Sequence, residues 1–191
     1  MSATRNRISG GIRVDIAQVA ARAADFGFRR ATFADIVAGV ALAESLMGSK
    51  IATAEEVARM DAVTGMTAWV RGEPVDGVFL TLPLSAEGER AVRNGTYVPG
   101  RPDPEHLAWH GKDVSGVYIG VYAGATKEAR RAVMAVAAVM RVELFAPVPA
   151  FARGATEDGR RSMASLGFVP VEGGLPDLWV QEPAASGSEA A

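Results

Sequence analysis

A short turn, residues 123–127, carries the residue types of an anion-binding site. It follows a run rich in β-forming residues, 116–122, and precedes an apolar run typical of a helix that reaches about Met140. Where a strand feeds a helix through small residues, the first N–H groups of the helix lack intrahelical partners and point toward any anion placed there. A pyrophosphate would fit such a site. The residues predicted to contact it are Val121, Ala123, Gly124, Ala125, Thr126, Lys127, Arg130 and Arg131.

The same turn also has a purely structural interpretation. Thr126 would then be only the N-cap of the helix, and Arg130 and Arg131 would be part of a solvated helix face. The sequence alone leaves both interpretations open.

The two histidines, His106 and His110, are four residues apart. This spacing would put them on one face of a short helix, as in a zinc pair, but a third ligand at a recognisable spacing is missing. We therefore expect no metal site. His110 stays open as a base at an acceptor site, beside the alternative of a surface or capping histidine. The chain contains no cysteine, which excludes disulfides, a thiol nucleophile and thiolate metal ligands.

Local signals place further elements around the turn. Glycine at 48 ends an apolar helical pattern, Thr53 and Glu56 form a capping box, and Thr156 with Gly167 brackets a short helix. The predicted helices are 12–25, 33–47, 53–63, 85–94, 127–140 and 156–166. The predicted strands are an antiparallel hairpin of 66–70 with 75–82, then 116–122, a parallel partner at 142–145, and strands after Gly167.

This order of elements resembles the GCN5-related N-acetyltransferase (GNAT) superfamily over residues 27–182. The segment from Phe28 to Ile36 is similar to the opening strand and turn of that family, where an Arg-x-Ala-Thr-x-x-Asp pattern is common. The resemblance implies an α+β fold with a mixed, mainly antiparallel sheet flanked by helices. Residues 1–26 are then an N-terminal helical extension, and residues 183–191, which lack aromatic anchors, a disordered tail.

The resemblance implies acetyl-CoA or another acyl-CoA as the cofactor and an amine of a small molecule or peptide as the acceptor. Two positions depart from the family pattern. Arg130 stands where the cofactor loop has its first glycine, and Met163 stands where the family has its proton-donating tyrosine. The positive side chains Lys127, Arg130 and Arg131 either replace backbone contacts to the cofactor, or the cofactor site is lost.

Without the family tyrosine, the groups that could move protons should project from the central strands or from the long loop. The candidate catalytic residues are Tyr118, Tyr122, His110 and Glu143. The preferred hypothesis is an acyltransferase that moves an acyl group from coenzyme A to an amine. The alternative is a catalytically inactive protein of the same fold that binds a ligand or another protein.

Composition limits the other classes. The 191 residues suit one domain, and the formal net charge of −2 offers no excess of positive charge for nucleic acid. The longest apolar run is far shorter than the ~20 residues that cross a membrane, and the basic N-terminus lacks the apolar run of a signal peptide. We therefore expect a cytoplasmic protein without membrane partners. The N-terminal helix could cover a sheet edge or a second subunit, so a homodimer remains open.

Overall fold

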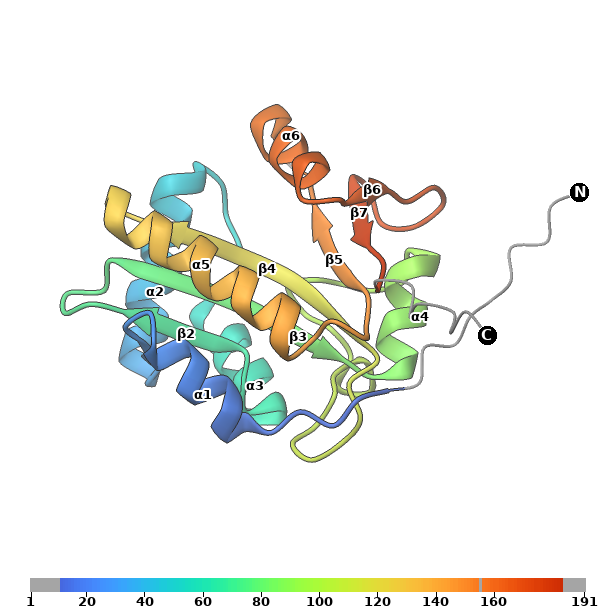
Figure 1. Ribbon diagram of the computed structural model, residues 1–191, viewed down its shortest axis with the longest axis horizontal. Coiled ribbons are helices and arrows are strands. Elements are labelled where there is room, and N and C mark those ends of the chain that lie inside the picture. Colours follow the sequence, from blue (N-terminus) through green and yellow to red (C-terminus); the bar gives the residue numbers. More distant parts are fainter. Residues whose placement is uncertain (1–10, 155, 184–191) are drawn as a thin grey trace, which may run out of the picture.

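A computed structural model describes residues 11–154 and 156–183, except for the side chain of Asp158. In the described residues, seven strands form one sheet in the order β1-β2-β3-β4-β5-β7-β6 (Figure 1). All neighbouring strands are antiparallel except β4 and β5, which are parallel. The predicted α+β class, with a mixed and mainly antiparallel sheet flanked by helices, is confirmed. The strands are β1 (Phe28–Arg30), β2 (Ala68–Arg71), β3 (Gly77–Leu84), β4 (Gly116–Gly124), β5 (Ala150–Arg153), β6 (Val169–Pro170) and β7 (Leu178–Gln181).

Helices cover both faces of the sheet. The helices α1 (Ile16–Ala24) and α5 (Lys127–Glu143) lie on one face, in front of the sheet in Figure 1. The helices α2 (Phe33–Met47), α3 (Ala54–Thr64) and α4 (Ala86–Asn94) lie on the other. A short 3-10 helix, η1 (Pro104–His106), packs against α4, and α6 (Glu157–Ser165) connects β5 to β6. The two faces therefore carry separate apolar cores.

The helix ends predicted at Gly48, Thr53 and Thr126 are confirmed, because they depend on local capping, whereas the helix predicted at 12–25 begins only at Ile16. Thr32 and Thr53 each form a capping box, with Asp35 and Glu56 respectively. Gly48 ends α2 in the left-handed conformation, with φ of 68°. Thr126 accepts a hydrogen bond from the N–H of Ala129 at 3.0 Å and so caps α5.

One predicted strand is wrong. The structure has no strand at 142–145: α5 continues through Glu143, and the parallel partner of β4 is β5, further along the chain. The nine residues of β4 span about 30 Å. The helix that runs back along this strand must cover a similar distance, and the seventeen residues of α5 span ~26 Å. Phe145 and Val148 then pack in the core beneath α5, and Pro147 and Pro149 precede the strand instead of ending it.

The additional N-terminal helix is confirmed as α1, with Asp15 as its N-cap. It packs on β1 and on α5 through the buried residues Val19 and Ala23. Residues 1–10 and 184–191, which include most of the predicted tail, lie outside the described residues. None of the helices in the described part of the chain combines the length and apolar character that a membrane crossing needs.

The carboxylate of Asp35 links the start of α2 to β1 and to the N-cap residue, and its contribution to stability can be tested. Its carboxylate accepts two hydrogen bonds from Arg29, at 2.5 and 2.9 Å, and one from the N–H of Thr32 at 2.8 Å. The Arg29 hydrogen bonds, helped by those from Thr32, hold the pKa of Asp35 well below its usual range, although burial opposes the shift. We expect Asp35→Asn to lower the free energy of unfolding at pH 7 by about 1–2 kcal/mol.

The pH dependence of this loss has a definite sign. Because the folded-state pKa of Asp35 is depressed, its contribution is present above the unfolded value of about 3.9 and declines as the pH falls below it. Urea denaturation of wild type and Asp35→Asn should therefore differ at pH 7 and converge toward acid pH. Glu55→Gln, in the exposed first turn of α3, is the matched control and should cost less than about 0.5 kcal/mol. A constant difference at all pH values would contradict this assignment.

Candidate functional site

The parallel strands β4 and β5 separate after a short contact. They pair at two positions, Val117 with Ala150 and Tyr118 with Phe151, while β4 continues six residues further, to Gly124. Figure 1 shows β5 leaving β4 together with β7 and β6. In the part of the chain that the structure describes, no strand pairs with this edge of β4 beyond Tyr118. The backbone groups of that edge are available to a ligand.

A β-bulge lies at the start of this separation. The pairing of β3 with β4 shifts from Leu80↔Val121 to Thr81↔Ile119, so Gly120 is the extra residue. A bulge leaves a backbone group unpaired and reverses the side-chain alternation that follows it. Tyr118 and Tyr122, four residues apart, would share a face of a regular strand, but here they lie on opposite faces.

Tyr118 lies where β4 and β5 still touch, on the face covered by α2, α3 and α4. It is 3% exposed, and its hydroxyl makes no hydrogen bond within the described residues. Burial raises the pKa of Tyr118 to about 12, although the positive charge of Arg153 lowers it in part. The phenol therefore keeps its proton at neutral pH and can donate it.

Tyr122 lies on the other face, in the core beneath α5, with its ring 6.4 Å from that of Phe79 in an edge-on arrangement. Burial raises the pKa of Tyr122, and the charge of Arg141 opposes the shift. Tyr122 is half-buried and packs against the apolar cluster that contains Phe79 and the buried side chains of α5. The structure therefore does not bring the two candidate tyrosines together.

The two other candidate catalytic residues lie elsewhere. His110 is exposed, and its N–H donates to the carbonyl of Val63 at the end of α3. Glu143 ends α5 and forms an ion pair of 2.7 Å with Arg22 of α1. Within the described residues, no hydrogen bond, ion pair or ring contact joins either of them to Tyr118, whose ring neighbour is Tyr97.

At the predicted anion site at the start of α5, some backbone N–H groups are already hydrogen-bonded and others have no intrahelical acceptor. The N–H of Ala125 donates to the carbonyl of Asp76, and the N–H of Ala129 is capped by Thr126. Lys127 and Glu128 begin the helix, so their N–H groups have no intrahelical acceptor. The Glu128 carboxylate pairs with Arg71, which also holds Asp76 at 2.6 Å. This acid in the first turn reduces the attraction for an anion.

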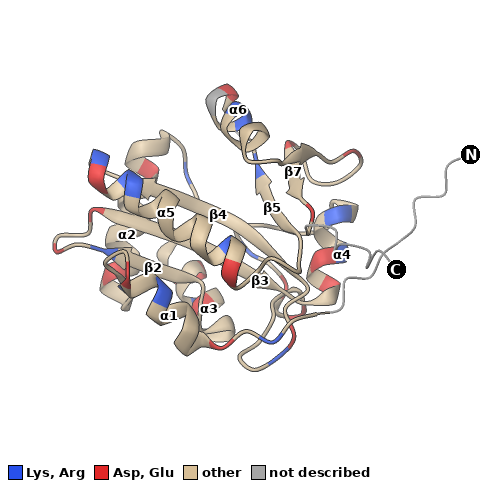
Figure 2. Ribbon diagram, viewed as in Figure 1, with Lys and Arg blue, Asp and Glu red and all other residues tan. Residues whose placement is uncertain are grey.

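Three cations surround that helix start. Lys127, Arg130 and Arg131 are exposed and make no ion pair within the described residues. In Figure 2, the ribbon is coloured for Lys and Arg at this end of α5 and also on β5 and α6. Arg130 is on the helix face that also carries Arg141, which donates to Gln181 of β7, so this face is turned toward β5 and β7. Arg130 thus lies beside the opening between β4 and β5.

The opposite side of the opening is formed by α6 and the end of β5. Arg160 donates to the carbonyl of Gly154 at 2.8 Å, and Met163 and Trp179 pack beside Ile119 against the buried residues of β5. A Cβ atom on Gly154 would lie 2.9 Å from the Met163 Cε atom. Met163 therefore provides an apolar contact here, and no proton donor.

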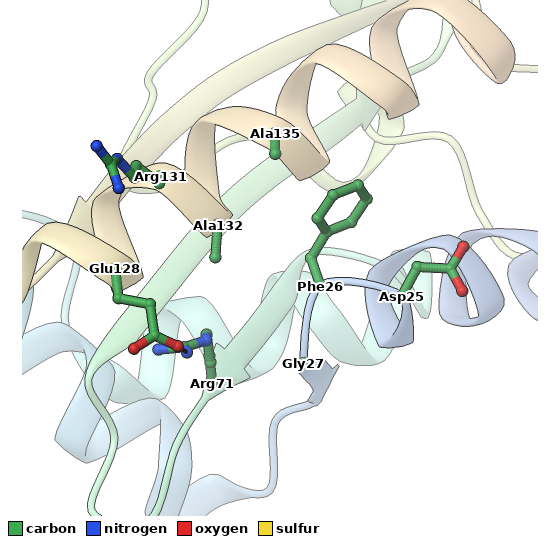
Figure 3. A pocket seen from close by; sticks show the side chains of 8 residues that line it. All are labelled: Asp25, Phe26, Gly27, Arg71, Glu128, Arg131, Ala132 and Ala135. Atoms are coloured by element: carbon green, nitrogen blue, oxygen red, sulfur yellow. Dashed lines mark hydrogen bonds and ion pairs between the residues drawn. The ribbon is translucent and has the colours of Figure 1, made fainter.

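A separate pocket of about 490 Å³ lies on the other side of α5 (Figure 3). It is bordered by Asp25, Arg71, Glu128 and Arg131, with Phe26 and two alanines between them. Its charges are of both signs, and Arg71 and Glu128 neutralise each other. None of its residues belongs to β4 or β5, so the pocket is distinct from the opening between these strands.

The structure also identifies groups near Tyr118 that sequence reasoning missed. Tyr97, after α4, has its ring 5.3 Å from that of Tyr118, and His106 has its ring 5.8 Å from that of Tyr97. Arg93 of α4 lies 5.0 Å from the ring centre of Phe151 and pairs with Glu89 and Glu182. Burial raises the pKa of Glu89, and Arg93 opposes this shift. No local motif marks these residues, because they meet only through the tertiary fold.

Comparisons with known proteins give matches in structure alone. No protein-family model matches the sequence, and no curated protein matches it either. The chain is similar in structure to Ard1 from Thermoplasma volcanium, with 13% identity, a TM-score of 0.49, and coverage of 82% of this chain and 97% of that one. It is also similar to the GNAT-like decarboxylase GphF in complex with isobutyryl-CoA, with 14% identity, a TM-score of 0.45, and coverage of 72% and 71%. Both likenesses are at low identity, and the α+β class with a mixed, mainly antiparallel sheet rests on the strand order and helices of the structure itself. In the described residues, no group of three or more acidic or histidine side chains could hold a metal ion.

Gly124 allows α5 to start against the end of β4, and this packing can be tested. A Cβ atom at position 124 would lie 2.5 Å from the backbone nitrogen of Arg130, so the helix would have to move. We expect Gly124→Ala to lower the free energy of unfolding by about 1–3 kcal/mol. Gly100→Ala is the matched control, because its Cβ would meet Ala52 at an ordinary 3.8 Å. Equal urea midpoints for the two variants would show that the start of α5 is not fixed by this contact.

Proposed function

We propose that this protein binds an acyl-CoA with its pantetheine arm between β4 and β5, and transfers the acyl group to an amine of a small molecule or peptide. The observation that carries the proposal is the separation of these strands after two paired positions, with a bulge at Gly120. An extended arm with two amide groups can hydrogen-bond to an unpaired strand edge as another strand would. The N–H and C=O groups of the strand edge can pair with the amide groups of the pantetheine arm.

The cofactor phosphates would lie at the start of α5. Unpaired N–H groups and the positive end of the helix dipole favour anions there. Lys127 and Arg130 would add charge-assisted hydrogen bonds, which supports the interpretation of Arg130 as a substitute for the missing glycine contacts. Arg130 is exposed and free of ion pairs within the described residues, so it is available for this role.

The reactive thioester would lie close to the bulge and to Tyr118. The acceptor amine attacks the thioester carbonyl, a C–N bond forms, and the C–S bond breaks. A backbone N–H at Gly120 would stabilise the negative charge that develops on the carbonyl oxygen. Tyr118 would give its proton to the leaving thiolate and recover one from the amine nitrogen, in place of the tyrosine that Met163 replaces.

A non-catalytic role is the second candidate. It is favoured by Met163, which presents a thioether at the end of β5 where the family has an acid, and by the Glu128 carboxylate in the first turn of α5. A ligand-binding protein of this kind would still use the opening between β4 and β5. A non-catalytic protein that binds an acyl-CoA would therefore differ from the acyltransferase in turnover alone.

Acetyl-CoA binding is the first test. A ligand that binds only the folded state raises Tm by mass action, so millimolar acetyl-CoA should raise the Tm of the wild-type protein. Arg130→Gln should weaken the Kd measured by calorimetry about tenfold, because one charge-assisted contact is lost. Arg59→Gln, an exposed cation on α3, is the matched control and should bind like wild type. No Tm shift with acetyl-CoA or longer acyl-CoA thioesters would remove the acyltransferase and favour a non-catalytic protein that binds another ligand or a protein.

Tyr118→Phe tests the proposed acid. We expect kcat to fall about 100-fold, with the Kd for acetyl-CoA unchanged, because the proton donor is lost while the strand edge stays intact. Turnover can be followed as release of free thiol, to which this cysteine-free chain contributes nothing. Since the pKa of Tyr118 is about 12, the acid should stay functional up to about pH 10. An unchanged kcat would exclude Tyr118 as the donor, and binding without any turnover would favour the non-catalytic role.

A further inference from the structure

Three aromatic side chains form a row that leads from Tyr118 to the surface loop. The ring of Tyr97 lies 5.3 Å from that of Tyr118, and the ring of His106 lies 5.8 Å from that of Tyr97. The three residues come from different elements: Tyr118 from β4, Tyr97 from the segment after α4, and His106 from η1. Tyr118 and Tyr97 are buried, whereas His106 is only half-buried. The row therefore connects the junction of β4 and β5 to a residue that reaches solvent.

The polar atoms of this row lack partners. The Tyr97 hydroxyl and the Nδ1 atom of His106 are both buried without a hydrogen bond, and the Tyr118 hydroxyl makes none within the described residues. Buried polar atoms in folded proteins are nearly always paired, and an exception calls for an explanation. Burial strongly raises the pKa of Tyr97, with a further contribution from Tyr118, so Tyr97 keeps its proton at neutral pH. If the row served packing alone, phenylalanine at position 97 would fill the same space without a buried, unpaired hydroxyl.

The position of His106 is fixed by its backbone. Its carbonyl accepts the N–H of Ser85 at 3.0 Å, and its N–H donates to the carbonyl of Asp103 at 2.9 Å. A Cβ atom on Gly88 would lie only 1.9 Å from that carbonyl oxygen, so η1 can approach α4 only because residue 88 is glycine. The imidazole is therefore held beside Tyr97 by a packed unit of α4 and η1.

We propose that Tyr97 and His106 carry a proton from the acceptor amine at Tyr118 to solvent. This inference rests on the proposed acyl transfer and adds two residues to it. Most alkylamines are protonated in water at neutral pH and must lose a proton before they can attack a thioester. Tyr118 is the group at the reacting centre, and a buried phenol that keeps its own proton cannot hold a second one. The relay supplies an exit for that proton.

The proton balance is simple. The ammonium gives one proton to the Tyr118 hydroxyl as Tyr118 passes its own to Tyr97, and Tyr97 passes its own to Nδ1 of His106. Both tyrosines end neutral, and the imidazolium releases a proton to water from Nε2. The neutral amine then attacks, and its second proton goes to the thiolate as the C–S bond breaks. Each transfer needs a direct hydrogen bond or one bridging water, and such contacts commonly tighten only when the substrate is bound.

Tyr97→Phe separates this role from a structural one. Because the wild-type hydroxyl has no partner, its removal should leave Tm unchanged or higher. The Kd for acetyl-CoA should also stay unchanged, while kcat with an alkylamine falls at least about tenfold. Val98→Ala, exposed on the same segment, is the matched control for both measurements. A lower Tm for Tyr97→Phe with unchanged kcat would show that the hydroxyl is structural and would overturn the relay.

Acceptor basicity provides the second test. Methoxyamine is already neutral in water and needs no relay, so Tyr97→Phe and His106→Asn should slow thiol release with an alkylamine and change it less than about twofold with methoxyamine. Equal losses with both amines would indicate a structural defect and would overturn the relay alone. Failure of the wild-type protein to bind acetyl-CoA would instead overturn the proposed acyl transfer, and the relay with it.

Discussion

The structure depends on how few backbone hydrogen bonds join β4 to β5. With two paired positions, the sheet consists of a four-stranded half and a three-stranded half that share only a short seam. Side chains must therefore hold the halves together at that end. Arg93 pairs with Glu182 from one face, at 2.9 and 3.1 Å, and Arg141 donates to Gln181 at 2.7 Å from the other. The two arginines fix the end of β7 from both sides and leave the opposite end of the seam free to separate.

The bulge at Gly120 divides the chemistry between the two faces. Because it reverses the side-chain alternation of β4, Tyr118 lies under α4 and Tyr122 lies under α5. The cations at the start of α5 then flank the opening on one side, and the row from Tyr118 to His106 lies on the other. A thioester donor and an amine acceptor could approach the same point of β4 from different directions, which is what a direct transfer between them requires.

Predictions from the sequence were right where the interaction joins residues close together in the chain, and wrong or missing where it joins distant ones. Helix ends at Gly48, Thr53 and Thr126 were predictable, because a cap involves residues at most four positions apart. The strand predicted at 142–145 failed, because the length of α5 is set by the length of β4 and not by the β-propensity of Val142. The pairing of Arg93 with Glu182 spans 89 residues and has no local signal.

The sequence by itself determined the order of the elements, their caps and turns, and the small-residue start of α5, since each depends on neighbours along the chain. It also excluded cysteine chemistry. Only the tertiary structure decided which face each tyrosine occupies, because a single extra residue in β4 reverses every side chain after it. Likewise, only the packing of η1 against α4 brought His106 to Tyr97, since Gly88 permits an approach that no spacing in the sequence reveals.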